Sequence, residues 1–365
     1  LRTTYLHSAC LAIALLSCAP LGTRPSNEDV ERFSTSQHYN VEKKQFENRL
    51  PNVMEAMNRR VYSMDSFKAW MDGSEQGRPP GPLPTQQANI EAFSATDESL
   101  KIIWLGHSSF LLNMAGRIIL VDPIFSQAAS PVSLFVRRFQ EPPIPLKTLP
   151  PIDFTLISHD HYDHLDMETI EFFVERETRF IVPLGVKNHL TGWGIDAERV
   201  TEMDWWETAV FPEVTFIATP AQHFSGRDGI HPNETLWASW VVDSAEHKIY
   251  FSGDSGYDQH FRTIGDRYGP FDVVFLDSGQ YNQRWREVHM LPREAMQAAH
   301  DLRATYHFPV HWGMFELALH DWDDPIRRLT QLSNDSSVPL LAPQLGEMVQ
   351  LPGKLRSEAW WTTVH

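Results

Sequence analysis

The chain has 365 residues, 42% of them hydrophobic, which is enough for one large α/β domain with extensions or for two ordinary domains. Its formal net charge of −16, without clustered lysines and arginines, argues against a nucleic-acid partner, because a polyphosphate would be repelled. The two cysteines, Cys10 and Cys18, both lie near the N-terminus, so the rest of the chain offers neither a disulfide nor a thiolate metal ligand.

Residues 1–18 are predicted to be an export signal. Arg2 supplies a positive charge, and residues 8–16 form an apolar stretch that is too short to span a bilayer. The stretch ends in Leu15-Leu16-Ser17-Cys18, which resembles the lipobox of bacterial lipoproteins and implies lipidation of Cys18. We therefore expect a lipid anchor in the bacterial cell envelope, at the outer membrane or the periplasmic face of a membrane. A short buried helix and an ordinary secretory signal are the alternatives.

Residues 19–95 are predicted to be a tether followed by a helical extension. Residues 19–45 are polar and mixed, without periodicity, which favours a tether. Apolar residues recur at helical spacing over residues 46–71. Residues 77–85 are rich in proline and glycine and are predicted to be a linker.

Residues 96–365 alternate between predicted strands and helices. Strands are predicted at 102–105, 110–112, 118–121, 154–157, 180–182, 214–217, 236–242, 248–251, 273–276 and 304–308. Helices are predicted at 167–177, 292–302 and 325–332, whereas the proline-rich residues 137–151 are irregular. Two runs of strands with interspersed helices predict an α/β sandwich.

One short segment carries most of the chemistry. Directly after a buried strand, four possible metal ligands fall within six positions: His159, His161, Asp163 and His164. Imidazole nitrogens and carboxylate oxygens suit Zn²⁺, although the same donors also suit Mn²⁺ or Fe. The alternative is a polar surface loop that is rich in histidine.

Three later segments each place one further donor just past a predicted strand, where loops carry functional groups: His223, Asp254 and His311. Taken singly, each of these residues is more often structural. Together with the four donors before them they make seven ligands, which is enough for two ions.

These motifs resemble the metallo-β-lactamase superfamily and, more narrowly, the N-acylphosphatidylethanolamine-hydrolysing phospholipase D group. The resemblance covers about residues 100–315 and is carried by residues 104–109, 121–126, 129–131, 150–153, 156–166, 219–223, 252–257 and 311–313. It implies an αββα sandwich, in which helices flank two mixed β-sheets, for a hydrolase domain over residues 96–365.

The resemblance also implies roles for single residues. His159, His161 and His223 would hold one Zn²⁺, and Asp163, His164 and His311 the second, with Asp254 bridging both. The residues given catalytic roles are Asp163, Asp254 and His289. His289 resembles a family histidine that contacts the substrate phosphate, and a surface histidine is the alternative.

The implied function is a zinc-dependent phosphodiesterase of the phospholipase D type that hydrolyses a phospholipid such as N-acylphosphatidylethanolamine. Two zinc ions would lower the pKa of a shared water toward about 7. The alternatives are a hydrolase of a lactone, a β-lactam or another ester or amide, and a metal-stabilised lipoprotein without catalysis. The oligomeric state stays open, with a dimer among the alternatives.

Residues around the predicted site are more ambiguous. Asp122 could orient a ligand imidazole or be a turn residue, and His107 could approach the site or be a turn histidine. Residues expected to be structural are His231, His307 and His320. Tryptophans that would line an apolar acyl groove or belong to the core are Trp205, Trp206, Trp237, Trp240 and Trp285.

Overall fold

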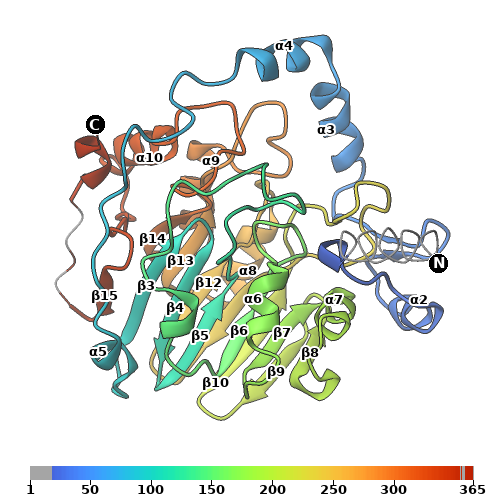
Figure 1. The fold of residues 1–365 in the computed structure, drawn as a ribbon, viewed down its shortest axis with the longest axis horizontal. Helices are drawn as coiled ribbons and strands as arrows, with labels where there is room; N and C mark the ends of the chain where they lie inside the picture. The colour runs from blue at the N-terminus through green and yellow to red at the C-terminus, as the bar shows by residue number, and fades with distance from the viewer. Residues whose placement is uncertain (1–18, 354, 356–357, 365) are drawn as a thin grey trace, which may run out of the picture.

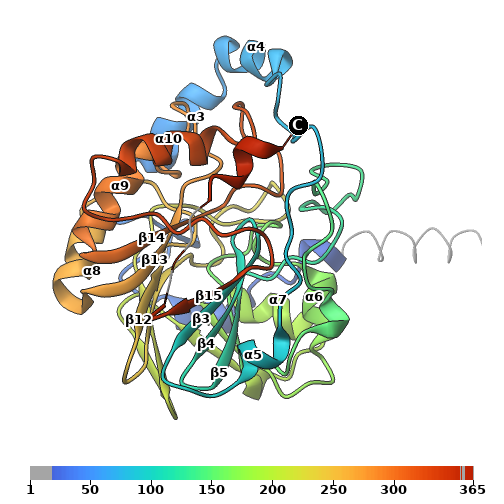
Figure 2. The same ribbon diagram turned by 90° about the vertical axis from the view of Figure 1, so that its left-hand side faces the viewer.

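The computed structural model describes residues 19–353, 355 and 358–364, in which two mixed β-sheets pack face to face (Figures 1 and 2). Helices cover both outer faces (Figure 2): α5 (Ile90–Ser94), α6 (Met167–Phe172) and α7 (Val186–Gly192) on one, and α8 (His260–Tyr268), α9 (Pro292–Asp301) and α10 (Asp324–Ser333) on the other. This confirms the predicted αββα sandwich. The predicted signal and lipobox, including Cys18, lie outside the described residues.

The first sheet has seven strands in the order β15-β3-β4-β5-β6-β7-β8. They are β3 (Leu100–Gly106), β4 (Ser109–Met114), β5 (Arg117–Val121), β6 (Phe154–Leu156), β7 (Arg179–Pro183), β8 (Val200–Met203) and β15 (Met348–Leu351). Strands β3 to β5 form an antiparallel meander, and β5 to β8 are parallel.

The second sheet has six strands in the order β14-β13-β12-β11-β10-β9. They are β9 (Thr208–Phe211), β10 (Val214–Thr219), β11 (Ser239–Asp243), β12 (Lys248–Phe251), β13 (Phe271–Asp277) and β14 (Ala304–Val310). Strands β10 to β12 alternate in direction, and β12 to β14 are parallel. Strands β10, β12, β13 and β14 therefore all run the same way, and the residues that follow them meet at one edge.

The inner strands of both sheets are buried on both faces, which explains why they are mostly hydrophobic. In β3, Ile102 and Trp104 pack between the two sheets, whereas Ile103 and Leu105 pack under the outer helices. The second sheet buries its outer face in the same way against α8, α9 and α10.

The N-terminal segment corrects the prediction of a tether. Residues 19–46 form η1 (Ala19–Leu21), α2 (Asn27–Phe33), β1 (Tyr39–Asn40) and β2 (Gln45–Phe46). Phe33 and Phe46 are fully buried in the main core, with ring centroids 5.2 Å apart. The segment is therefore part of the folded body and not a free tether.

The predicted helical extension is two helices: α3 (Val53–Val61) and α4 (Met64–Asp72), which extend from the body (Figure 1). The break falls at Ser63, whose side chain accepts a hydrogen bond from the main chain of Ser66 and caps α4. The predicted linker at 77–85 also packs on the body, because Leu83 is buried. Among the described residues, no helix combines the length and the apolar character needed to cross a membrane.

Candidate metal centre

The seven predicted ligands come together where strands of both sheets end. His159, His161, Asp163 and His164 follow β6, whereas His223 follows β10, Asp254 follows β12 and His311 follows β14. All seven side chains are buried or half-buried. The arrangement matches the general rule that functional groups gather beyond the carboxyl ends of strands.

Three imidazoles form the first cluster. Nε2 of His159 lies 2.9 Å from Nδ1 of His161, which lies 3.2 Å from Nε2 of His223. Ligand atoms held about 2.0 Å from a tetrahedral ion are roughly 3.3 Å apart, so these nitrogens can share one ion. Oδ2 of Asp254 lies 3.9 Å from Nε2 of His159 and 3.7 Å from Nε2 of His223.

The second cluster contains Asp163, His164 and His311. Nε2 of His164 lies 3.5 Å from Oδ2 of Asp163 and 3.2 Å from Oδ2 of Asp254. Nε2 of His311 lies 3.1 Å and 3.3 Å from the same two oxygens. Asp254 therefore lies between the two clusters, where its carboxylate can bridge two ions.

Two carboxylates hold the far side of the second cluster. Nδ1 of His164 contacts Oδ2 of Asp122 at 2.7 Å, and Nδ1 of His311 contacts Oδ1 of Asp277 at 3.0 Å. Such contacts fix the tautomer of a ligand imidazole and direct its Nε2 toward the metal. The contact predicted for Asp122 is confirmed.

Main-chain contacts hold His223 in the first cluster. Nδ1 of His223 donates to the carbonyl of Val288 at 3.1 Å. The side-chain amide of Asn48 brackets the main chain of His223, accepting from its N–H at 3.0 Å and donating to its carbonyl at 2.7 Å. The N-terminal segment thus positions one of the predicted ligands.

Two buried atoms in the clusters have no hydrogen-bond partner among the described residues: Nε2 of His164 and Oδ1 of Asp254. Leaving such an atom unpaired costs about 1–3 kcal/mol. A coordinated cation would satisfy both atoms, and the surrounding donors form groups of histidine and carboxylate atoms within 4.8 Å of one another. The residues present therefore fit two divalent metal ions.

The charge states of His159, His223 and Asp163 suit ligation, whereas His164 would lose a proton on binding a cation. Burial lowers the pKa of His159 and of His223 well below the usual range, so both imidazoles are neutral. Burial opposes ionisation of Asp163, but the positive charge of His164 and hydrogen bonds from His107 and His311 outweigh it and hold the pKa of Asp163 well below its usual range. Burial also opposes charge on His164, but Asp254 and Asp163 raise the pKa of His164 well above the usual range.

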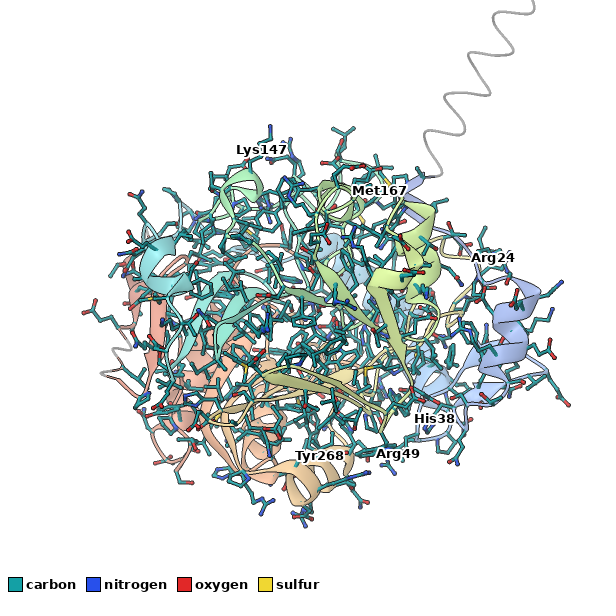
Figure 3. The ribbon with its side chains drawn as sticks, turned by 90° about the horizontal axis from the view of Figure 1, so that it is seen from below. Arg24, His38, Arg49, Lys147, Met167 and Tyr268 are labelled. Atoms are coloured by element: carbon teal, nitrogen blue, oxygen red, sulfur yellow. The ribbon has the colours of Figure 1, made fainter. Side chains whose placement is uncertain are left out.

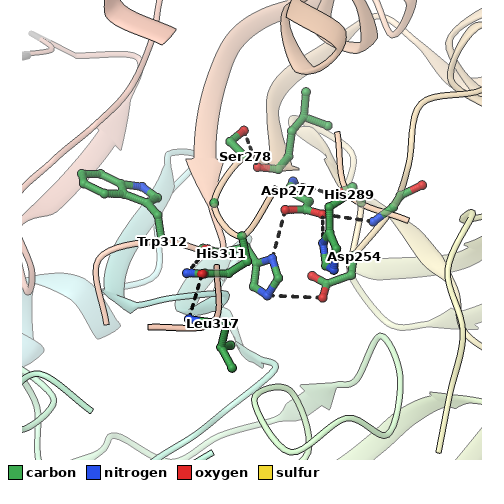
Figure 4. A network of polar contacts seen from close by, with 12 residues as sticks. Asp254, Asp277, Ser278, His289, His311, Trp312 and Leu317 are labelled. Atoms are coloured by element: carbon green, nitrogen blue, oxygen red, sulfur yellow. Dashed lines mark hydrogen bonds and ion pairs between the residues drawn. The ribbon is translucent and has the colours of Figure 1, made fainter. Parts of the chain in front are cut away.

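His289 lies beside the second cluster (Figure 4). Its Nδ1 contacts Oδ2 of Asp277 at 2.8 Å, so one carboxylate joins His289 to His311. The His289 ring centroid lies 5.1 Å from the ring centroids of His223 and of His311. With a side chain only 12% exposed, His289 is not the surface residue of the alternative interpretation.

A cavity of about 310 Å³ opens over the clusters. His289 and five of the predicted ligands line its polar side. Its other side is an apolar wall formed by Met57, Val61, Phe224, Trp285, Val288 and Leu317. Helix α3 of the N-terminal extension thus supplies two residues, Met57 and Val61, to the cavity.

The tryptophans divide between the cavity and the core. Trp285 lines the cavity, in agreement with the groove interpretation. Trp205, Trp237 and Trp240 are buried in the main core, and Trp206 packs against it.

Comparison with known proteins agrees with this geometry. A family model described as a β-lactamase superfamily domain matches residues 117–312. The chain is 34% identical over 254 residues to N-acyl-phosphatidylethanolamine-hydrolyzing phospholipase D 1 of Caenorhabditis elegans, covering 66% of this chain and 71% of that protein. The chain belongs to the metallo-β-lactamase superfamily.

Two further comparisons extend the likeness of this superfamily member. It is 41% identical over 289 residues to an uncharacterised protein of Mycobacterium tuberculosis, covering 78% of this chain and 77% of that protein. Its fold resembles that of a metallo hydrolase from the archaeon Ignicoccus hospitalis, with a TM-score of 0.56 and 20% identity over 70% of this chain and all of that one. The chain therefore belongs to a superfamily of metal-dependent hydrolases and has the metallo-β-lactamase fold.

The structure adds two residues to the site of this metallo-hydrolase. Nε2 of the buried His107 lies 2.9 Å from Oδ2 of Asp163, so His107 does approach the site. Asp277 was not predicted from the sequence, although it ends β13 much as Asp254 follows β12. The histidines expected to be structural lie outside the clusters: His231, His307 and His320.

Proposed function

We propose that this metallo-hydrolase is a zinc-dependent phosphodiesterase of the phospholipase D type, acting on a phospholipid such as N-acylphosphatidylethanolamine. The observation that carries the proposal is the union, in one cavity, of a two-ion ligand set with an apolar wall. A phosphate diester over the ions would lay an alkyl chain along that wall. The activity named for the Caenorhabditis elegans relative supports the same substrate class.

The residues of the site divide the work of such a reaction. Bound divalent ions would lower the pKa of a water toward about 7 and neutralise charge on the phosphate oxygens. Asp163 and Asp254 would hold the ion positions, with Asp254 placed between the two clusters. The P–O bond to the head-group alcohol breaks, water supplies the new P–O bond, and the leaving oxygen takes a proton. Asp277 is hydrogen-bonded to Nδ1 of His289, so Nε2 of His289 is the atom left to donate that proton.

Zinc is the proposed metal because five of the seven ligands are histidines. Imidazole suits Zn²⁺ well, whereas a site for Mg²⁺ or Ca²⁺ would be built from oxygens. Metal analysis of the purified protein tests this assignment. Two equivalents of zinc would support the assignment. Two equivalents of manganese or iron would change the assigned metal but not the assigned ligands.

A lipid anchor at Cys18 is the second part of the proposal. It rests on the lipobox, and the carbonyl of the next residue, Ala19, accepts a hydrogen bond from Nε1 of Trp193 at 2.9 Å, which holds that residue on the folded body. The anchor would hold the folded body close to a membrane, beside a phospholipid substrate. Mass spectrometry of membrane-extracted protein tests it, and an unmodified Cys18 in the mature chain would refute it.

A substrate panel tests the activity. N-acylphosphatidylethanolamine and bis-p-nitrophenyl phosphate are expected to be hydrolysed, whereas a homoserine lactone and nitrocefin are not. His161→Ala should abolish turnover of both phosphodiesters without unfolding the sandwich. If the protein hydrolysed only the lactone or nitrocefin, the proposed phosphodiesterase activity would be wrong. The protein would then be an ester or amide hydrolase.

A further inference from the structure

A second cavity, of about 930 Å³, lies beside the metal centre. It opens between the segment that follows α4 and the loop that follows β5, which lie side by side (Figure 2) because Arg78 donates to the carbonyls of Arg137 and Arg138. Leu317 lines both this cavity and the metal cavity, so the two adjoin. We call it the arginine cavity, after its lining residues Arg78, Arg137 and Arg138.

These three arginines line one cavity in a chain of net charge −16. In the part of the chain that the structure describes, none of them forms an ion pair with a carboxylate; Arg78 and Arg138 donate to main-chain carbonyls instead. Two glutamates, Glu141 and Glu316, also line the cavity, and Glu141 is engaged by Gln127. With three arginines against two glutamates, the lining has a net positive charge although the chain as a whole is acidic.

Arg138 has the strongest need for a partner. It is only 6% exposed, and its Nη2 donates to the carbonyl of Ile124 at 3.0 Å. Its Nε and Nη1 atoms are buried with no hydrogen-bond partner among the described residues. A buried guanidinium with unmet donors is costly, and an oxyanion is a partner that can accept from two adjacent donors on one edge of a guanidinium at once.

Exposed apolar side chains flank the same cavity. Leu134 is 78% exposed, Phe135 64% and Leu317 37%, and all three belong to the lining. Apolar surface of this kind, gathered at one place and bordered by polar residues, is typical of a ligand site. An oxyanion alone would leave these side chains in water, whereas an alkyl chain would cover them.

We propose that the arginine cavity binds an anionic amphiphile, with an oxyanion head on the arginines and an alkyl chain along Leu134, Phe135 and Leu317. The head is a phosphate or a carboxylate, since guanidinium binds both bidentately. The site is separate from the metal centre because its lining contains none of the predicted metal ligands. It does not depend on which bond the metal centre hydrolyses.

The proposal is tested by titrating the full-length protein with dodecyl phosphate, below its micelle concentration, in an isothermal titration calorimeter. A saturable site is expected that is distinct from any binding of dodecyl phosphate at the metal centre and that persists in His161→Ala. Arg137→Glu and Arg138→Leu should each weaken binding by about tenfold or more. Lys147→Glu is the matched charge reversal, at an exposed residue outside the cavity lining (Figure 3), and should leave the affinity unchanged.

Arg137 is exposed and its side chain makes no described hydrogen bond, so Arg137→Glu keeps the test decisive even where Arg138→Leu fails to fold. Phe135→Ser should weaken the binding of dodecyl phosphate, whose alkyl chain contacts this side chain in the proposal. It should leave the weak binding of inorganic phosphate unchanged. His161→Ala should keep full affinity, which separates this site from the metal centre. Titration with dodecanoate identifies the head group that the site prefers. If dodecanoate binds as tightly as dodecyl phosphate, the site accepts either oxyanion; if it binds more weakly, the site prefers phosphate.

Four outcomes would overturn the proposal. They are the absence of saturable binding, an affinity unchanged in both arginine variants, inorganic phosphate binding as tightly as dodecyl phosphate, and loss of binding in His161→Ala. The last outcome would place the anion on the metal centre. None of the four depends on whether the substrate panel supports phosphodiester hydrolysis.

Discussion

Nδ1 of His289 donates to Oδ2 of Asp277 over 2.8 Å, in a carboxylate that is fully buried at the end of β13. The second oxygen of the same carboxylate lies 3.0 Å from Nδ1 of His311. The main-chain N–H of Ser255 in turn donates to Oδ2 of Asp277 at 3.3 Å, which helps to fix the carboxylate itself. One aspartate thus orients both a predicted metal ligand and the proposed proton donor.

The substitution Asp277→Asn tests this double role. An amide has one acceptor oxygen, so it cannot accept from both imidazoles, and its NH₂ group faces one of them. We expect kcat on bis-p-nitrophenyl phosphate to fall by about 10–100-fold and the metal affinity to fall with it. Kinetics and metal titration of the purified variant measure the two effects.

Asp272→Asn is the matched control for Asp277→Asn. Asp272 lies near the start of the same strand, is 40% exposed, and contacts His247 and the main chain of Lys248. It should retain activity and metal. Wild-type turnover and metal affinity in Asp277→Asn would show that the carboxylate supports only the fold.

His289→Gln separates proton donation from metal binding. The variant should keep both metals, because His289 is not among the seven predicted ligands. For a phospholipid with an alkoxide leaving group, kcat should fall by about 10²–10⁴-fold. For bis-p-nitrophenyl phosphate the loss should be far smaller, since p-nitrophenolate leaves without a proton.

His231→Gln is the control for His289→Gln, because His231 is 38% exposed and, among the described residues, its ring hydrogen-bonds only with Asp228. It should match the unaltered protein on both substrates. An equal loss on both substrates in His289→Gln would contradict the assignment of His289 as the proton donor and favour a role in binding the phosphate.

Much of the site could be predicted because its residues belong to patterns within short segments of the sequence. Strand β12 is observed over the residues predicted for it, Lys248–Phe251, because a short apolar run is a local pattern. The ligands of the first segment lie within six positions, and each later ligand follows a strand. Since strands of one direction end at one edge, their convergence could be predicted from the sequence.

What the sequence could not predict depends on contacts between distant residues. Phe33 lies in a polar segment without periodicity, and only the core of the folded body shows that it is buried. Strand β9 is short and has no buried residue, so its pattern does not distinguish it from a loop. Asp277 needed the positions of His289 and His311, which lie 12 and 34 residues away along the chain.

Removal of the metals should lower stability. Without cations the buried carboxylates of Asp163 and Asp254 lose their proposed partners, and Oδ1 of Asp254 stays unpaired. Dialysis against a chelator should lower the Tm, and added Zn²⁺ should restore it, because an ion at 100 times its Kd stabilises the folded state by about 2.7 kcal/mol. Differential scanning calorimetry measures the shift.

His161→Ala provides the control for metal removal. It lacks one ligand of the first cluster, so the difference in Tm between its metal-loaded and metal-free forms should be smaller. A chelator-treated protein with an unchanged Tm would contradict the presence of bound metal. An unchanged difference in His161→Ala would remove His161 from the ligand set.

The apolar wall contributed by α3 should select substrates by chain length. Met57→Ser and Val61→Ser place hydroxyls against the alkyl chain, so kcat/KM for a long-chain N-acylphosphatidylethanolamine should fall by about tenfold. Turnover of bis-p-nitrophenyl phosphate, which has no alkyl chain, should stay unchanged. Met64→Ser, on α4 at a residue that is 80% exposed, is the control and should alter neither. If both substrates lost turnover equally in Met57→Ser, α3 would support the fold of the site and not its chain specificity.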